Sequence, residues 1–353
     1  MQNHNSGTAC TACIIIVNYN GGQALPECLR SVLKTLRPGD ALIVVDNAST
    51  DGSAEAVRRD FPNVTMVCSD RNLGFAAGNN LGATRASTSH LIFLNPDTTV
   101  TRGWLESLVS PLQSGSVTGL ATSKILLSDQ PDRINTCGNS VHISGLTLCR
   151  GLGQGRSSFE HPEEVPAVSG ASFAISRALF EELGGFDEDF FLYMEDTDLS
   201  LRARLAGWSC LLVPDSEVLH HYSFRLGPLK IFYQERNRYL MLLKIFKWRS
   251  LIALLPALML AEIVTWGYSV MNRRSLEKVK AYYWIFSHWQ LVLSKRRGAQ
   301  RLRKSSDRQL LLSLGTSLDF AQASGGWPAK TAALVLNPLF RLARALVAAL
   351  VWW

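Results

Sequence analysis

Four short apolar runs alternate with four amphipathic segments over the first 112 residues, and this alternation constrains the fold more than any other feature. Strands that alternate with helices build a parallel sheet with helices on both faces. We therefore predict an α/β fold with a mostly parallel sheet. The expected strands are 12–18, 41–46, 64–68 and 90–94, and the expected helices are 26–36, 53–60, 76–87 and 101–112.

The rest of the chain divides into three parts by composition. Residues 115–168 are rich in Gly, Ser, Pro and Asp and predict an irregular insertion. Order returns with a strand at 171–175, two helices closed by glycines, and a strand at 210–213. Long helical stretches follow His221, so we place a domain boundary near Arg225, between residues 1–225 and a helical region at 226–353.

Ligands of parallel sheets bind beyond the carboxyl ends of the strands, so the residues after each strand are the candidate site. No glycine-rich phosphate loop follows the first strand. A metal ion can neutralise phosphates in place of such a loop. The candidate ligand-binding residues in these positions are Asn18, Tyr19, Asn20, Asp46, Asn72, Gly74 and Asn95, together with Asp97.

Two carboxylates stand out among them, and each has a structural alternative. Asp46 suits a base or ribose contact, but the segment after it is also an ordinary strand-to-helix turn. Asp97 suits a divalent cation, although Asn95-Pro96-Asp97 also has the composition of a simple turn. His220 or His221 could complete a site for Mn²⁺ beside a carboxylate.

An acidic cluster opens the helix that follows residue 194. Negative side chains in a first helical turn are stabilised by the helix dipole, which is a structural alternative for Glu195, Asp196 and Asp198 alike. Asp198 can also pair with Arg202 one turn later. Asp196 has no such partner nearby in sequence, and an unpaired carboxylate near a ligand site is a candidate general base.

The ordered set of motifs resembles the family 2 inverting glycosyltransferases, especially the bacterial rhamnosyltransferase-like branch. The matching text, from Thr11 to Ser223, is "IIIVNYN", "VVDNASTDGS", "NLGFAAGNN", "FLNPDTTV", "GGFDEDFFLYMEDTDLSLR" and "VLHHYS". The resemblance implies a Rossmann-like GT-A fold that binds a nucleoside diphosphate sugar. It also implies an enzyme that moves a sugar, with rhamnose as one candidate, to a glycan or polyprenyl-linked acceptor in cell-surface polysaccharide synthesis.

The resemblance assigns roles residue by residue. Asp46 would contact the base, Asp97 would end the metal-binding D-x-D, and Asp196 would deprotonate the acceptor hydroxyl. His220, chosen over His221 by its spacing, would contact the metal (Mg²⁺ or Mn²⁺) or the pyrophosphate, and Glu195 would help to bind substrate. The chain departs from the family in one place, since Asn95 replaces the first carboxylate of D-x-D.

The region after residue 225 mixes apolar, aromatic and basic residues, which suits an anionic membrane surface. The stretch "SLIALLPALMLAEIVTWGYSVMN" is long enough to span a bilayer, but Pro256 and Glu262 interrupt it. We expect interfacial attachment at the inner face of the cytoplasmic membrane, with packing against the catalytic domain or another subunit as the alternative. No secretory signal is visible, and we expect no nucleic-acid partner.

Two other functions remain open from the sequence. A sugar nucleotidyltransferase would use a similar fold, but it would need a basic glycine-rich loop that "NYNGGQALPE" lacks. A non-catalytic binding protein on the same fold is favoured only by the missing first carboxylate of D-x-D. The donor, the acceptor, the linkage and the oligomeric state are not determined by the sequence.

Overall fold

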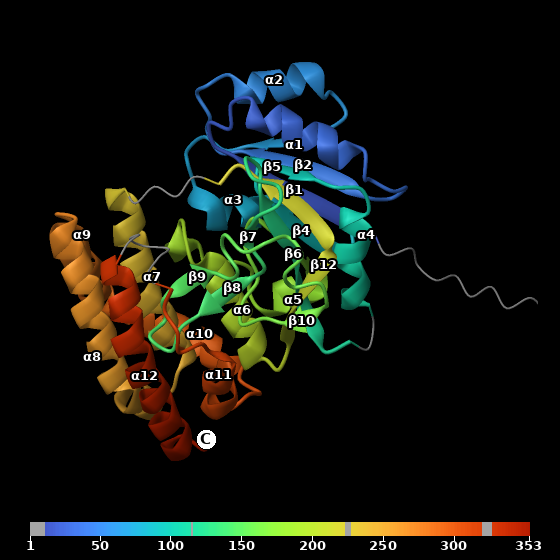
Figure 1. The fold of residues 1–353 in the computed structure, drawn as a ribbon. Coiled ribbons are helices and arrows are strands. Elements are labelled where there is room, and N and C mark those ends of the chain that lie inside the picture. Colours follow the sequence, from blue (N-terminus) through green and yellow to red (C-terminus); the bar gives the residue numbers. More distant parts are fainter. Residues whose placement is uncertain (1–10, 114–115, 223–226, 320–326) are drawn as a thin grey trace, which may run out of the picture.

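The computed structural model describes residues 11–113, 116–222, 227–319 and 327–353, without the side chains of 327–332. One large mixed sheet forms its centre, in the order β10-β12-β6-β11-β4-β1-β2-β3 (Figure 1). The strands β1, β2, β3, β4, β6 and β12 run in one direction, and β11 runs against both of its neighbours. The predicted α/β class with a mostly parallel sheet is confirmed.

The first half of the fold follows the predicted alternation closely. Its elements are β1 (Ala12–Asn18), α1 (Ala24–Leu33), β2 (Ala41–Asp46), α2 (Ser53–Asp60), β3 (Thr65–Cys68), α3 (Gly74–Ala83), β4 (His90–Leu94), β5 (Thr98–Val100) and α4 (Trp104–Val109). Strand β1 is buried along its whole length, because alternate side chains enter two different cores. Ile14 packs with α1, α2 and α4 on one face, while Ile15 packs with α3 and later helices on the other.

The predicted irregular insertion at 115–168 is wrong in its first part. Residues Thr118–Leu127 form β6, a buried strand of ten residues between β11 and β12 in the main sheet. The flanking glycine and polar residues hide this strand from a composition argument, and neighbouring strands cover both of its edges. The remainder is short and strand-rich, with β7 (Ile134–Thr136), β8 (Asn139–Val141), β9 (Thr147–Cys149) and β10 (Glu163–Glu164).

The N-terminal part, residues 11–222, closes with one helix pair and one long strand. Its elements are β11 (Ser172–Ser176), α5 (Arg177–Glu182), α6 (Glu195–Leu205) and β12 (Ser209–His220). Strand β12 is much longer than the predicted 210–213, because its register shifts between Val213 and Glu217 and the strand then continues beside β6 and β5. This continuation carries His220 to the sheet edge.

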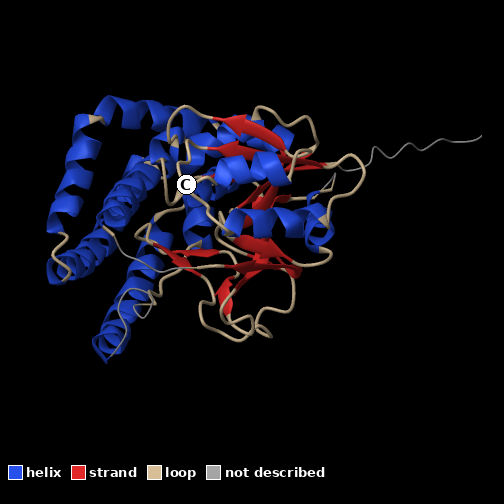
Figure 2. Ribbon diagram, turned by 90° about the horizontal axis from the view of Figure 1, so that it is seen from above, coloured by secondary structure: helices blue, strands red, loops and turns tan. Residues whose placement is uncertain are grey.

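The predicted domain boundary near Arg225 lies outside the described residues. Helices fill the chain beyond it and gather on one side of the molecule, away from most of the strands (Figure 2). They are α7 (Pro228–Ile245), α8 (Trp248–Met271), α9 (Ser275–Ser287), α10 (Trp289–Arg301), α11 (Asp307–Ser313) and α12 (Trp327–Leu350). A third core joins them to α6 and β8, so this region packs directly on the N-terminal part, residues 11–222.

Helix α8 contains the acid that interrupts the long apolar stretch. Glu262 Oε1 accepts a hydrogen bond from the Tyr239 hydroxyl and pairs with Arg238. Its Oε2 accepts from the Tyr282 hydroxyl and lies 3.0 Å from Lys278 Nζ. The acid is therefore neutralised by α7 and α9 within the protein. Among the described residues, two helical segments, Trp248–Met271 and Ala333–Leu350, are long and apolar enough to cross a membrane by length and composition.

Candidate functional site

The corner after β1 is organised by one buried amide, Asn18. Its Nδ2 donates to Ser53 Oγ at 2.8 Å and Ser49 Oγ at 3.0 Å, and its Oδ1 accepts from the Gly21 amide at 3.1 Å. Asn20 in turn accepts from the Thr50 amide at 2.8 Å. These bonds join the loop after β1 to the loop after β2, so Asn18 and Asn20 shape the corner that a ligand would enter.

Two other predicted residues of this corner are placed differently. The Tyr19 side chain is 51% exposed, so its ring is open to a ligand. Asp46 is buried at the end of β2, where it accepts from the Ser49 amide at 3.3 Å and from Asn18 at 3.4 Å. Both contacts are long for hydrogen bonds, which leaves the carboxylate able to accept better donors.

The segment after β3 is tied to the same corner. Asn47 Nδ2 donates to Asn72 Oδ1 at 3.1 Å and to the Gly74 carbonyl at 3.0 Å. Gly74 has φ +78°, and a Cβ there would lie 2.4 Å from the Phe191 carbonyl oxygen. Glycine is therefore required at this point by both conformation and space. Asn47, which directly follows Asp46 at the end of β2, therefore joins the segment after β3 to this corner.

The predicted metal pair is brought together by strand register. His220 of β12 lies opposite Thr98 of β5, next to Asp97, and its Nε2 is 3.3 Å from Asp97 Oδ1. The other ring nitrogen, Nδ1, faces Asn135 Oδ1 at 2.8 Å, which fixes the ring orientation. His221 points elsewhere, with its Nε2 3.2 Å from Ser128 Oγ.

The surroundings of Asp97 lower the pKa of its carboxyl, which favours the charged form. Burial acts to raise the pKa of its carboxyl, but the contact with His220 outweighs burial and holds the pKa below the usual value. Asp97 Oδ1 is buried and has no hydrogen-bond partner among the described atoms. A carboxylate oxygen and an imidazole nitrogen that face each other fit a divalent cation. In the described part of the chain no third carboxylate, histidine or cysteine joins them.

The carboxylate of Asp196 is fully hydrogen-bonded, contrary to the prediction that it is unpaired. Its Oδ2 accepts from the Gly170 amide at 2.8 Å and from Asn139 Nδ2 at 2.9 Å. Its Oδ1 accepts from the amide of Thr197 at 2.6 Å and from the hydroxyl of the same residue at 3.2 Å. Gly170 and Asn139 come from segments distant in sequence, which a search for local partners could not find.

The acids of α6 have three different environments. Burial raises the pKa of Asp196, although its hydrogen bonds act against the shift, and burial with the charge of Asp196 raises that of Glu195 well above the usual value. Glu195 Oε2 is buried without a hydrogen-bond partner in the described residues. Asp198 is neutralised by Arg202 and Lys244, each at 2.8 Å, which confirms its predicted pairing with Arg202.

Asp97 and His220 are linked to Asp196 through one short backbone segment. Asp196 binds the Gly170 amide, and the next residue, Ala171, accepts a hydrogen bond from the Asn95 amide at 3.0 Å. Asn95 lies two residues before Asp97. The predicted residues at the ends of β4 and β12 and at the start of α6 are therefore assembled at one edge of the sheet.

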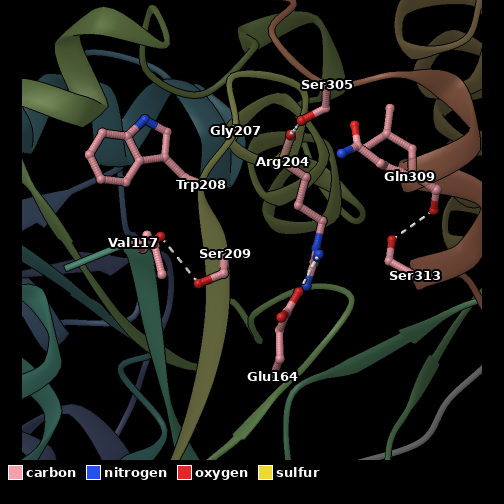
Figure 3. A pocket seen from close by; sticks show the side chains of 10 residues that line it. Val117, Glu164, Arg204, Gly207, Trp208, Ser209, Ser305, Gln309 and Ser313 are labelled. Carbon is pink, nitrogen blue, oxygen red and sulfur yellow. Dashed lines mark hydrogen bonds and ion pairs between the residues drawn. The ribbon is translucent and has the colours of Figure 1, made fainter. Parts of the chain in front are cut away.

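A hollow in the described chain lies elsewhere and contains none of these residues. It has a volume of about 300 Å³ and lies at the far end of α6 (Figure 3). Its most conspicuous cation, Arg204, is already bound to Glu164 at 2.7 Å and to the Pro166 carbonyl at 2.8 Å. Its lining residues are Val117, Glu164, Arg204, Gly207, Trp208, Ser209, Ser305, Gln309, Leu310 and Ser313.

Known proteins resemble this chain in sequence and in fold. Residues 13–184 match Glycosyl transferase family 2. N-acetylglucosaminyl-diphospho-decaprenol L-rhamnosyltransferase of Mycobacterium tuberculosis is 30% identical over 239 residues, which cover 61% of this chain and 77% of that protein. The O-antigen biosynthesis protein RfbC of Myxococcus xanthus is 30% identical over 216 residues, or 56% of this chain and 16% of that protein.

Solved structures extend the likeness in fold. GalNAc-T7 with UDP, GalNAc and Mn²⁺ has a TM-score of 0.56 at 21% identity, covering 67% of this chain and 48% of that one. TarS of S. aureus has a TM-score of 0.53 at 17% identity, covering 95% of this chain and 53% of that one. At these identities the likeness concerns the fold alone.

Proposed function

Since the chain belongs to glycosyl transferase family 2 and has the GT-A fold, as its motifs predicted, we propose that this glycosyltransferase inverts the sugar it transfers. The donor is a nucleoside diphosphate sugar, with rhamnose as the first candidate. The acceptor is a polyprenyl-linked glycan, and the product enters a cell-surface polysaccharide. The observation that carries this proposal is the assembly of Asp97, His220 and Asp196 around two hydrogen-bonded segments, 95–97 and 170–171.

The donor lies in the corner shaped by Asn18 and Asn20. Asp46, whose present hydrogen bonds are long, accepts from the base or the ribose, and the exposed ring of Tyr19 contacts the ligand from the solvent side. Asn72 and Gly74 bring the backbone after β3 close to the ligand, while Asn95 and Glu195 lie beside the transferred sugar. The order of these contacts follows the order of the strands in the sheet.

Asp97 Oδ1 and His220 Nε2 hold a divalent cation, Mg²⁺ or Mn²⁺, in this proposal. When bound, the cation neutralises the diphosphate that leaves. Asn135 keeps Nε2 of His220 turned toward Asp97 by bonding to Nδ1. The missing first carboxylate of D-x-D leaves the protein with two ligands, so we expect the diphosphate of the donor to complete the coordination and metal affinity to rise with nucleotide.

Asp196 acts as the general base. Its raised pKa makes the carboxylate a better proton acceptor than an ordinary aspartate, and bonds from Gly170 and Asn139 hold one oxygen in place. The acceptor hydroxyl replaces the longest of the four bonds, the one from the Thr197 hydroxyl. Asp196 takes the hydroxyl proton while the oxygen attacks the anomeric carbon from the face opposite the diphosphate, and a single displacement inverts that carbon.

We also propose that the protein lies on the membrane, at its cytoplasmic face where nucleotide sugars are made, through α8, α9 and α12. Each helix carries an exposed apolar stripe at helical spacing, and α8 packs against both of the others. Because Glu262 is bound inside the protein, attachment along the interface fits better than a span. The stripes are Ile252, Leu255, Met259, Ile263 and Val270; Leu276, Val279, Tyr283 and Phe286; and Val335, Leu339, Leu342, Leu346 and Leu350.

The direct test is transfer with defined substrates. The protein is incubated with a panel of nucleoside diphosphate sugars, Mn²⁺ and N-acetylglucosaminyl-diphospho-decaprenol in vesicles. We expect one donor to raise the melting temperature and to give a glycosylated lipid with inverted anomeric configuration. A donor that stabilises the protein without any transfer, across several lipid acceptors, would favour a binding protein instead.

A further inference from the structure

The backbone just before Asp196 has an unusual conformation. Phe191, Tyr193 and Met194 have φ angles of 60°, 68° and 69°, a region that side-chain-bearing residues rarely adopt. Such a conformation persists only where the surrounding structure imposes it. Helix α6 starts at Glu195 without a side-chain cap, so the loop 190–194 sets the direction of the first turn together with the bonds that Asp196 accepts from Gly170 and Asn139.

One side chain of α7 holds this loop. Asn237 is fully buried, and its Nδ2 donates to the carbonyl oxygens of Phe190 at 3.0 Å, Leu192 at 3.1 Å and Tyr193 at 2.7 Å. A side-chain amide has only two hydrogens, so one of them is shared between two carbonyls. These three carbonyls are free to accept from Asn237 because the irregular backbone of the loop keeps them out of the hydrogen-bond pattern of a helix or a strand.

Arg236 orients Asn237 and also donates hydrogen bonds to the backbone at the start of the loop. Its Nε donates to Asn237 Oδ1 at 2.9 Å, and its Nη2 donates to the carbonyls of Phe190, at 2.9 Å, and Asp189. The guanidinium lies 4.8 Å from the ring centre of Tyr233 and 4.6 Å from that of Trp284. Because Arg236 Nε donates to Oδ1 of Asn237, the NH₂ group of Asn237 must be the end of the amide that faces the loop.

The same loop touches the donor side of the site. The Phe191 carbonyl accepts from the Phe75 amide at 2.7 Å, directly after Gly74, and the Phe191 ring stacks on Tyr233 of α7 at 5.3 Å. The loop 190–194 is therefore enclosed between the segment after β3 and α7.

We propose that Asn237 is a positioning residue, which holds the loop 190–194 in the strained form that places Asp196 against the acceptor. This inference rests on the proposed function, in which Asp196 is the base. It makes the helical region after residue 226 part of the catalytic site as well as the means of membrane attachment. Asn237 touches neither substrate, so its removal moves the base without removing it.

The first test is kinetic and uses the full chain. In Asn237→Ala, kcat should fall by about 10²-fold because the base is misplaced, while the donor KM stays within about threefold. The matched control is Leu254→Ala in α8, which is fully buried in the core of the helical region and takes no part in the side-chain hydrogen bonds that hold the loop 190–194. It should lower the melting temperature and leave kcat unchanged below that temperature. Equal loss of kcat in both variants would overturn the proposal.

The second test does not depend on activity. Amide hydrogen exchange is followed in the peptide that covers 190–196. Exchange there should become faster in Asn237→Ala and stay at the wild-type rate in Leu254→Ala, and an unchanged rate in Asn237→Ala would overturn the inference. If wild-type protein transfers no sugar, the proposed function fails, while this measurement still decides whether Asn237 holds the loop. Should Asn237→Ala not fold, Asn237→Ser, which keeps one donor, should show the same local change at smaller amplitude.

Discussion

Replacing Asp196 with asparagine separates its two possible roles, as a helix-start residue and as a base. Asparagine has nearly the same shape but cannot take a proton from the acceptor. Its carbonyl oxygen can keep the bonds from Gly170 and Asn139, and its NH₂ group then faces the Thr197 amide, which is a donor 2.6 Å away. The bond from the Thr197 amide is lost and leaves one donor facing another, while the Thr197 hydroxyl can turn and accept from the new NH₂ group.

The structure gives a magnitude for each effect. An unsatisfied buried donor costs about 1–3 kcal/mol. Removing a charge from a site where burial disfavours it, next to Glu195, offsets part of this cost. The net loss of stability should therefore stay below about 3 kcal/mol. Loss of a general base should slow transfer by about 10²–10⁴-fold, which is about 3–5 kcal/mol in the activation barrier.

The assay measures transfer rate, donor affinity and melting temperature on one preparation, at a temperature where the variant is folded. Thr197→Val is the matched control, because it removes the weakest bond to the carboxylate and leaves the carboxylate in place. We expect Thr197→Val to keep its rate within about tenfold and Asp196→Asn to keep its donor affinity. Wild-type transfer by Asp196→Asn would refute the assignment and leave Glu195 as the remaining acid of that turn, since Asp198 is neutralised by its ion pairs.

Three further predictions use other parts of the structure. Asp97→Ala should abolish metal-dependent nucleotide binding, measured with Mn²⁺ and with chelator, and leave the melting temperature of the free protein nearly unchanged; equal nucleotide affinity in both conditions would remove Asp97 from the site. Glu195 keeps a proton in the folded state above the usual glutamate pKa of about 4.3, so stability falls as pH rises toward its raised folded pKa. Glu195→Gln should flatten that fall and raise the free energy of unfolding at neutral pH, as checked by urea titrations at several pH values. The double change Met259→Lys and Ile263→Lys should release the protein from vesicles in flotation while transfer to a water-soluble acceptor persists, and unchanged co-flotation would contradict the proposed membrane face.

Truncation after Arg225 is a poor test of membrane attachment, because it would also remove residues that hold α6 and the loop before it in the N-terminal part. Lys244 of α7 lies 2.8 Å from Asp198 of α6, where it neutralises a fully buried acid. Asn237 holds the loop before the same helix. We expect the truncated chain to lose its fold or its activity as well as its attachment, so surface substitutions are the cleaner experiment.

Much of the candidate site could be predicted because its residues follow strands. Asn18, Asp46 and Asp97 stand at strand ends, and strand ends of a parallel sheet meet at one edge whatever the details of packing. The partners of these residues could not be predicted in the same way. Asn135 and Asn139 lie in a segment with the composition of a loop, and only the fold brings them to His220 and Asp196.

The sequence by itself determined the α/β class, the limits of β1, β2 and β4, and the family, because these depend on local periodicity and on short motifs. Tertiary structure decided that 118–127 is a central strand, that His220 rather than His221 faces Asp97, and that the polar stretch around Asn237 is buried against the loop before α6. Each of these depends on which distant segments lie beside a residue. A hydrogen bond or a buried charge is stabilised by its partner, and the chain folds that partner into place from far along the sequence.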